Sequence, residues 1–357
     1  MRLYTKMALL ILVGVWPVSP LWAQDFEDVL PASRSSVLAG GTFYLLQPRF
    51  SDNVAYTRFT AANPAANAVT AGNSGQEFDW RLQPAFAGWF GYLSGEGLGV
   101  RARYFQFEQA SRTLQASLTE AEAGAKSTIT VPNFDLPGVG SGVSAFGSPG
   151  TLLAGVPPLG QDNLQFVSRL DIQAIDIEAL YRIDAQEWNF LYSGGGRYLR
   201  LHQRYDARLS NPGVGGATET QSLQFDREYN GGGPTLALEA TRQICQSHFA
   251  FFAVVRGSLI FGECRQDAVY AQKIDDPEGV STAGAQSTLT QSTRSTTRTI
   301  PVGEIELGLQ YNAPIGRHVV FVRAGFVGQT YFDAGSASQT TGNLSLLGGQ
   351  MSLGINY

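Results

Sequence analysis

The last thirteen residues of the chain, 345–357, alternate strictly between apolar and polar positions. The polar face carries Gly348, Gln350, Ser352, Gly354 and Asn356. Period-two alternation, with one face suited to hydrocarbon and the other to a polar interior, is typical of a transmembrane β-strand. We therefore predict that the apolar face of this C-terminal strand lies against lipid: Leu347, Met351, Leu353, Ile355 and Tyr357.

Ten segments alternate in this way and predict strands. They span 37–50, 78–93, 97–110, 163–183, 187–206, 222–243, 248–264, 298–312, 317–333 and 343–357. Connections after the even-numbered segments are short, and those after the odd-numbered segments are mostly long, which is the pattern of outer-membrane barrels. The predicted fold is all-β, an antiparallel transmembrane β-barrel of about ten strands (range about 8–12), with both termini on the periplasmic side.

The N-terminus has the pattern of a cleaved signal peptide. Arg2 and Lys6 precede an apolar run over 7–16, and Leu21-Trp22-Ala23 provides a cleavage site. This apolar run is shorter than the roughly 20 residues that a spanning helix needs. We expect a signal peptide over 1–23, a periplasmic lead-in over 24–36 and the barrel over 37–357.

Three of the predicted outer loops are long, at 51–77, 111–162 and 265–297. They are rich in Gly, Ala, Ser, Thr and Asn, a composition that cannot bury a core and indicates surface. The largest is compatible with a short helix over 114–125 and is the best candidate for a constriction or lid.

The same alternation assigns ten charged side chains to the barrel interior, because a charge on the lipid face costs about 2–4 kcal/mol at the bilayer midplane. Five are basic and five acidic: Arg101, Arg103, Arg197, Arg256, Arg323, Asp176, Glu178, Glu239, Glu304 and Glu306. Hydrated and spaced along a channel, these charges would line a pore. Matched one for one, they would instead close the barrel as ion pairs.

Other chemistry finds little support in the sequence. The net charge of −5 gives no electrostatic footprint for nucleic acid. His202 and Asp206 share a strand face but lie about 13 Å apart along it, so an acid–base pair would need a partner from another strand, such as Asp171. No His, Cys or Asp spacing suits a metal. The sequence predicts that the chain is not an enzyme and has neither cofactor nor metal.

Five short motifs occur in order along the chain: 97–104, 229–235, 256–262, 304–308 and 323–325. Their sequences are GLGVRARY, YNGGGPT, RGSLIFG, EIELG and RAG. Through them the chain resembles the Legionella-type pore-forming major outer membrane protein family, whose planctomycete branch is large. The resemblance covers roughly 37–357 and implies an outer-membrane β-barrel of porin-like type, with no catalytic motif to carry over.

The predicted function is passive diffusion of small hydrophilic solutes or ions through an outer-membrane barrel. The alternative is a non-conducting structural or adhesive barrel with a salt-bridged interior and surface-exposed binding loops. A third interpretation is a soluble secreted β-sandwich. Expected partners are outer-membrane lipid, small solutes or ions, and the barrel-assembly machinery, through the C-terminal strand with its terminal aromatic residue. The oligomeric state is left open.

Overall fold

A computed structural model describes residues 35–61, 71–119, 128–132, 161–212, 218–245, 247–277, 286–315, 318–337 and 341–356. The predicted signal peptide and nearly all of the lead-in lie outside these residues. No helix in the described ranges is long and apolar enough to span a membrane. Ten strands correspond to the predicted ones: β1 (Ser36–Phe50), β4 (Gln83–Leu93), β5 (Leu98–Ala110), β8 (Gln161–Ala185), β9 (Trp188–Pro212), β10 (Thr218–Gln243), β11 (Phe249–Asp275), β12 (Gln286–Ile315), β13 (His318–Tyr331) and β14 (Leu344–Asn356).

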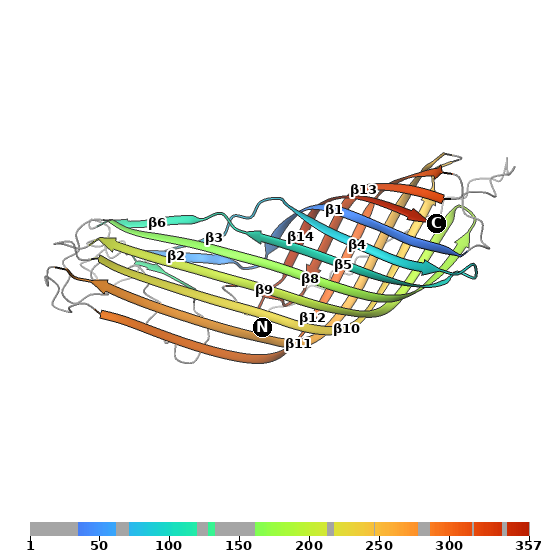
Figure 1. The fold of residues 1–357 in the computed structure, drawn as a ribbon. Helices are drawn as coiled ribbons and strands as arrows, with labels where there is room; N and C mark the ends of the chain where they lie inside the picture. Colours follow the sequence, from blue (N-terminus) through green and yellow to red (C-terminus); the bar gives the residue numbers. More distant parts are fainter. Residues whose placement is uncertain are drawn as a thin grey trace, which may run out of the picture. The chain divides into compact units, whose positions relative to one another are not determined.

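These ten strands form a closed antiparallel barrel (Figure 1). The order runs β5-β4-β1-β14-β13-β12-β11-β10-β9-β8, and a further pairing of β5 with β8 closes the ring. The first and last strands pair along their length, from Leu38 with Asn356 to Phe50 with Leu344. Where all ten strands run side by side, the closed ring has no free sheet edge, as the hydrocarbon core of a membrane requires. The predicted fold class is confirmed.

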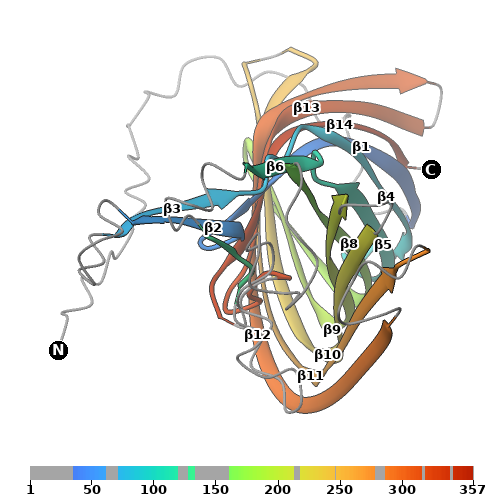
Figure 2. The same ribbon diagram turned by 90° about the vertical axis from the view of Figure 1, so that its left-hand side faces the viewer.

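The strands are of very unequal length. β8 to β12 have 25 to 30 residues, whereas β1, β4, β5, β13 and β14 have 11 to 15. Because about 9–11 residues suffice to cross a bilayer, β8 to β12 continue well beyond it as a tall wall on one side of the barrel. Figures 1 and 2 show this wall extending past the shorter strands.

Part of what the sequence predicts as loop is strand. The outer ends of β11 and β12 pair with each other from Arg265 with Ser295 to Ile274 with Gln286, inside the predicted loop 265–297. The segment compatible with a helix forms strand β6 (Leu114–Thr119), which pairs with the tall wall at β8. The Thr residues that helped to indicate a surface loop also suit an exposed strand when a neighbouring ladder is available, since β-branched residues favour pleated backbone.

The predicted loops 51–77 and 111–162 contribute a second, small sheet. It comprises β2 (Val54–Ala61), β3 (Ala71–Glu77) and β7 (Thr128–Thr130) in the order β3-β2-β7. Tyr56 of this sheet stacks on Phe166 of β8, and the Tyr205 hydroxyl of β9 donates to the Ala55 carbonyl at 2.7 Å. The small sheet therefore packs on the inner face of the tall wall.

Glycine allows neighbouring strands to approach closely at two positions in the barrel. At Gly233 of β10 an added Cβ would lie 1.9 Å from the Leu259 carbonyl oxygen, and at Gly195 it would lie 2.0 Å from that of Ile177. Both contacts are with backbone of the neighbouring strand, which cannot rotate away. One glycine of each GGG run thus allows close approach of the neighbouring strand.

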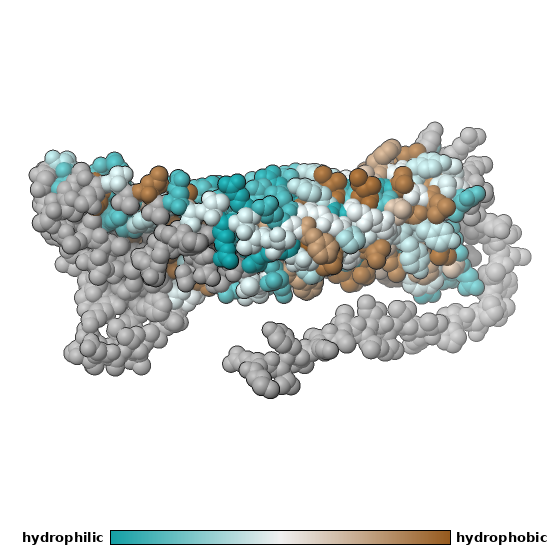
Figure 3. Space-filling view, turned by 90° about the horizontal axis from the view of Figure 1, so that it is seen from below, coloured by the Kyte–Doolittle hydropathy of each residue, from teal (hydrophilic) through white to brown (hydrophobic). Residues whose placement is uncertain are grey.

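The outer face of the barrel is apolar across the level where all ten strands run. Leu347, Met351 and Leu353 of β14 are exposed as predicted, Ile355 is half-buried, and Tyr357 lies outside the described residues. Figure 3 shows apolar side chains gathered over this half, beside a hydrophilic region toward the middle of the molecule. The outward apolar set matches the lipid-facing band of a transmembrane barrel.

The lipid band ends at an outer aromatic row, consisting of Tyr104, Tyr198 and Phe261. These exposed residues are linked by cross-strand register through Ile175 and Gly232. The next outward positions on β9 are Arg200, His202 and Arg204. Aromatic rings at the boundary and charged side chains beyond it mark the outer edge of the hydrocarbon region.

The two cysteines are unpaired, as the predicted strand spacing requires. Cys245 is exposed at a turn and Cys264 is buried in β11. We expect a maleimide to modify one thiol of the folded protein and both after denaturation, measured as intact mass. Modification of two thiols in the native state, or of none after denaturation, would contradict this placement.

Candidate functional site

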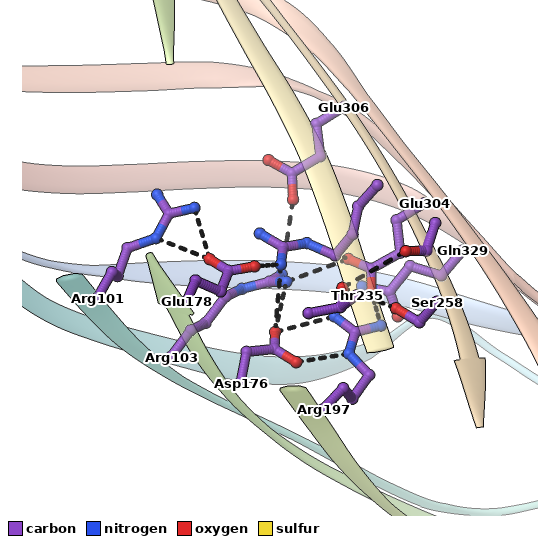
Figure 4. Close-up of polar contacts among 12 residues, drawn as sticks. Arg101, Arg103, Asp176, Glu178, Arg197, Thr235, Ser258, Glu304, Glu306 and Gln329 are labelled. Atoms are coloured by element: carbon purple, nitrogen blue, oxygen red, sulfur yellow. Dashed lines mark hydrogen bonds and ion pairs between the residues drawn. The ribbon is translucent and has the colours of Figure 1, made fainter. Parts of the chain in front are cut away.

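The ten charged residues predicted for the interior all point into the barrel and meet in one ion-pair network. They come from β5, β8, β9, β10, β11, β12 and β13, on positions that alternate with the lipid-facing ones. The members, in chain order, are Arg101, Arg103, Asp176, Glu178, Arg197, Glu239, Arg256, Glu304, Glu306 and Arg323. Figure 4 shows most of them converging from facing walls.

Arg197 is at the centre of the network. Its guanidinium donates from Nε and Nη2 to the two carboxylate oxygens of Asp176, at 2.5 and 2.9 Å, and from Nη1 to Glu304. Side chains of Arg197 and Asp176 are both only 2% exposed. Bidentate geometry of this kind gives the strongest arginine–carboxylate pairs.

Two further arginines join the walls around this centre. Arg256 contacts Glu178 and lies 3.5 Å from Asp176 and 3.9 Å from Glu304. Arg103, from the opposite side of the barrel, lies 3.1 Å from Glu304 and 3.6 Å from Asp176 (Figure 4). Each central carboxylate therefore contacts more than one guanidinium, which offsets the large cost of taking these charges out of water.

The network continues toward β10 and β13. Arg101 donates to Glu178 at 2.9 Å and to Glu239 at 2.5 Å, and Arg323 lies 3.6 Å from Glu239. Glu306 is held most loosely, 3.8 Å from Arg103 and 3.4 Å from the Tyr44 hydroxyl. The five positive and five negative charges thus compensate one another within a single connected cluster.

Three polar side chains at one side of the network, on β12, β13 and β14, are less tightly paired, and we call them the seam: Glu306, Arg323 and Gln350. The side chains of Glu306 and Arg323 keep 14% and 19% exposure although they point inward. Gln350 of β14, which the sequence places on the interior face, is buried with neither amide atom hydrogen-bonded. These partly exposed or unpaired polar groups are the least tightly paired part of the interior and lie along its β12–β14 side.

An aromatic layer lies inside the barrel, toward the end opposite to the extension of the tall wall. The Arg323 guanidinium lies 5.0 Å from the ring centre of Phe252 and 4.9 Å from that of Phe321. Trp89 stacks on Phe321 with ring centres 6.5 Å apart. Sequence analysis did not single out Phe252 or Trp89, because their contacts with Arg323 and Phe321 join strands that are distant in the chain.

At the end of the barrel from which the tall wall extends, the interior is apolar and packed. The core includes Phe107, Phe166, Leu201 and Tyr205 from the walls. Residues of the β13–β14 connection also turn inward: Ala334, Ser336 and Ala337 are buried. Gln203 donates to the Gly335 carbonyl at 3.1 Å and Arg227 to that of Ser336 at 3.4 Å. The β13–β14 connection therefore helps to fill the interior at this end of the barrel. The sequence predicted a constriction or lid from 111–162, most of which lies outside the described residues.

His202 has a partner that the sequence did not identify. Its Nε2 lies 3.3 Å from a carboxylate oxygen of Asp226 on β10, whereas Asp171 lies opposite it on β8. Partial burial opposes ionisation of Asp226, but hydrogen bonds from His202 and Gln224 outweigh it and lower the pKa of that carboxyl. The pair faces outward beyond the outer aromatic row. Across the described ranges, no group of three or more His, Cys, Asp or Glu residues is arranged to hold a metal.

Comparison with known proteins gives a family match. Residues 30–353 match the family model described as Legionella pneumophila major outer membrane protein precursor, which is nearly the whole chain. No curated protein matches the chain.

Solved structures similar to this chain are outer-membrane proteins. The Escherichia coli outer membrane protease OmpT is 10% identical, with a TM-score of 0.41, covering 90% of this chain and 96% of its own. A Pseudomonas aeruginosa FadL homologue is 6% identical, with a TM-score of 0.24, covering 91% and 90%. The sequence-based prediction that the chain is not an enzyme is contradicted by this comparison, in which an outer membrane protease is among the similar structures.

Proposed function

The chain belongs to the Legionella pneumophila major outer membrane protein family, and we propose that it is an outer-membrane barrel whose lumen is closed to solutes. Its location is the outer membrane. In this proposal the lumen does not conduct, the barrel anchors the protein in lipid, and the tall wall presents a polar surface outside the membrane. This is the structural or adhesive alternative considered from the sequence.

The observation that carries the proposal is the buried, compensated charge network. A permeating ion would have to separate partners such as Arg197 and Asp176, both 2% exposed. Removing one partner from a buried pair costs about 3–5 kcal/mol, so such a barrier disfavours free diffusion. The aromatic layer on one side and the apolar core on the other support the same conclusion.

A second candidate is passive diffusion of small hydrophilic solutes or ions. The seam lined by Glu306, Arg323 and Gln350 favours it, because these side chains retain exposure or unpaired polar atoms inside the barrel. Diffusion along this seam would admit only small ions beside the network.

Conductance of the purified protein in a planar bilayer separates the two candidates. We expect the wild-type barrel, verified as folded by heat-modifiable migration on a gel, to insert without stable conductance steps. Regular steps whose ion selectivity changes in Glu306→Gln would contradict the closed barrel and support diffusion along the seam. Steps that are unaffected by Glu306→Gln would contradict both the closure and the assignment of Glu306 to the path.

A further inference from the structure

A groove opens on the outer face of the barrel between β4 and β5. It has a volume of about 440 Å³ and is lined by Pro84, Phe86, Gly88, Tyr104, Gln106 and Glu108, with Ala85 and Ala87 at its floor. We propose that this groove binds a phospholipid with a primary ammonium headgroup, its acyl chain on the aromatic end and its ammonium at Glu108. Lipid binding in this groove takes place on the outer face and does not depend on whether the lumen conducts.

Missing side chains create the groove. Gly88 lies directly opposite Tyr104 in the ladder between β4 and β5, and Gly41 lies opposite Gly88 on β1. The neighbours Phe86 and Tyr104 are 61% and 43% exposed, so they form the sides of a depression. An added Cβ at Gly88 would approach no atom closer than 3.9 Å, so neither strand approach nor backbone conformation requires glycine here.

The groove crosses the boundary of the lipid band. Tyr104 belongs to the outer aromatic row, and Gln106 and Glu108 are the next two outward positions on the same strand. One end is therefore continuous with the hydrocarbon-facing surface and the other lies at headgroup level. An amphiphile with an apolar chain and a polar head matches this change in character, and a soluble ligand does not.

Charge selects the headgroup. Glu108 lies directly opposite Asp171 on β8, and like charges in this position destabilise a sheet. Partial burial and the Glu108 carboxylate raise the pKa of Asp171, although Arg200, His202 and Gln173 act in the opposite direction. One carboxylate oxygen of Asp171 is buried without a hydrogen-bond partner. Neither carboxylate forms an ion pair within the part of the chain described. A primary ammonium donates three hydrogen bonds and would relieve this repulsion, whereas an anionic headgroup would add to it.

Native mass spectrometry of the full-length folded protein in detergent tests the proposal. Probes are phosphatidylethanolamine, phosphatidylcholine and phosphatidylglycerol with identical acyl chains. We expect phosphatidylethanolamine to be retained about tenfold more strongly than the other two, as the loss of one or two charge-assisted hydrogen bonds would predict. The double variant Glu108→Gln/Asp171→Asn should lose this preference, and Gly88→Leu, which fills the groove, should lose all three adducts.

Matched controls lie on the same outer face. Gly257→Leu adds the same side chain on β11, where nothing lies within 4 Å, and Glu263→Gln removes an outward carboxylate remote from the groove. Both should bind lipid like the wild type. Equal retention of the three lipids, or an unchanged preference in the double variant, would overturn the headgroup assignment. Unchanged adducts in Gly88→Leu would overturn the groove itself.

Discussion

Replacing Arg197 with methionine is expected to lower the free energy of unfolding by about 3–5 kcal/mol. Methionine keeps much of the side-chain volume but leaves the buried Asp176 and Glu304 with fewer guanidinium partners. Arg103 and Arg256 still contact both carboxylates, so the barrel should fold but resist denaturant less. The measurement is urea unfolding in lipid vesicles, followed by tryptophan fluorescence and by the heat-modifiable gel shift.

Arg265→Met is the matched control. Arg265 also donates to an aspartate, Asp267, at 2.8 Å, but its side chain is 62% exposed. Exposed pairs contribute about 0–1 kcal/mol, since water solvates the charges once the pair is broken. If Arg197→Met were no more destabilising than Arg265→Met, the interior would be hydrated, and the closed-barrel proposal would be wrong.

Gly233→Ala is expected to impair assembly of the barrel severely. The new Cβ would lie 1.9 Å from the Leu259 carbonyl oxygen, 3.0 Å from its carbon and 3.2 Å from the Ile260 Cα. Only movement of β10 away from β11 relieves the clash, and overpacking of this kind costs about 1–3 kcal/mol or more. We expect most of the refolded protein to lack the heat-modifiable form.

Gly257→Ala provides the comparison, because it changes the same residue type at a position of β11 with nothing within 4 Å of an added Cβ. It should fold to the same extent as the wild type. Normal assembly of Gly233→Ala would show that the two strands lie farther apart than described. Poor assembly of both variants would point to general sensitivity to glycine replacement, contrary to the close-approach explanation.

Alternation placed the ten charged residues on one face of their strands, where the structure has them paired, but it did not reveal which residues pair. Each of the ten residues could be assigned to the lumen because every second position on its strand is apolar, and lipid excludes charge. Which arginine meets which carboxylate depends on the tilt and stagger of strands far apart in sequence. Arg197 and Glu304, for example, are separated by 107 residues. The pairing of His202 with Asp226 was missed for a more local reason, since it depends on the register between β9 and the neighbouring β10.

By itself the sequence determined the location and the type of fold, because the two-residue period and the lipid boundary act on each strand separately. The ten barrel strands and the exposed Leu347, Met351 and Leu353 follow from that local pattern. The tertiary structure alone decided that predicted loops extend β11 and β12, that a small sheet packs on the tall wall, and that the interior charges are compensated. These features depend on ladder pairing and on packing across the lumen, neither of which leaves a signal along a single strand.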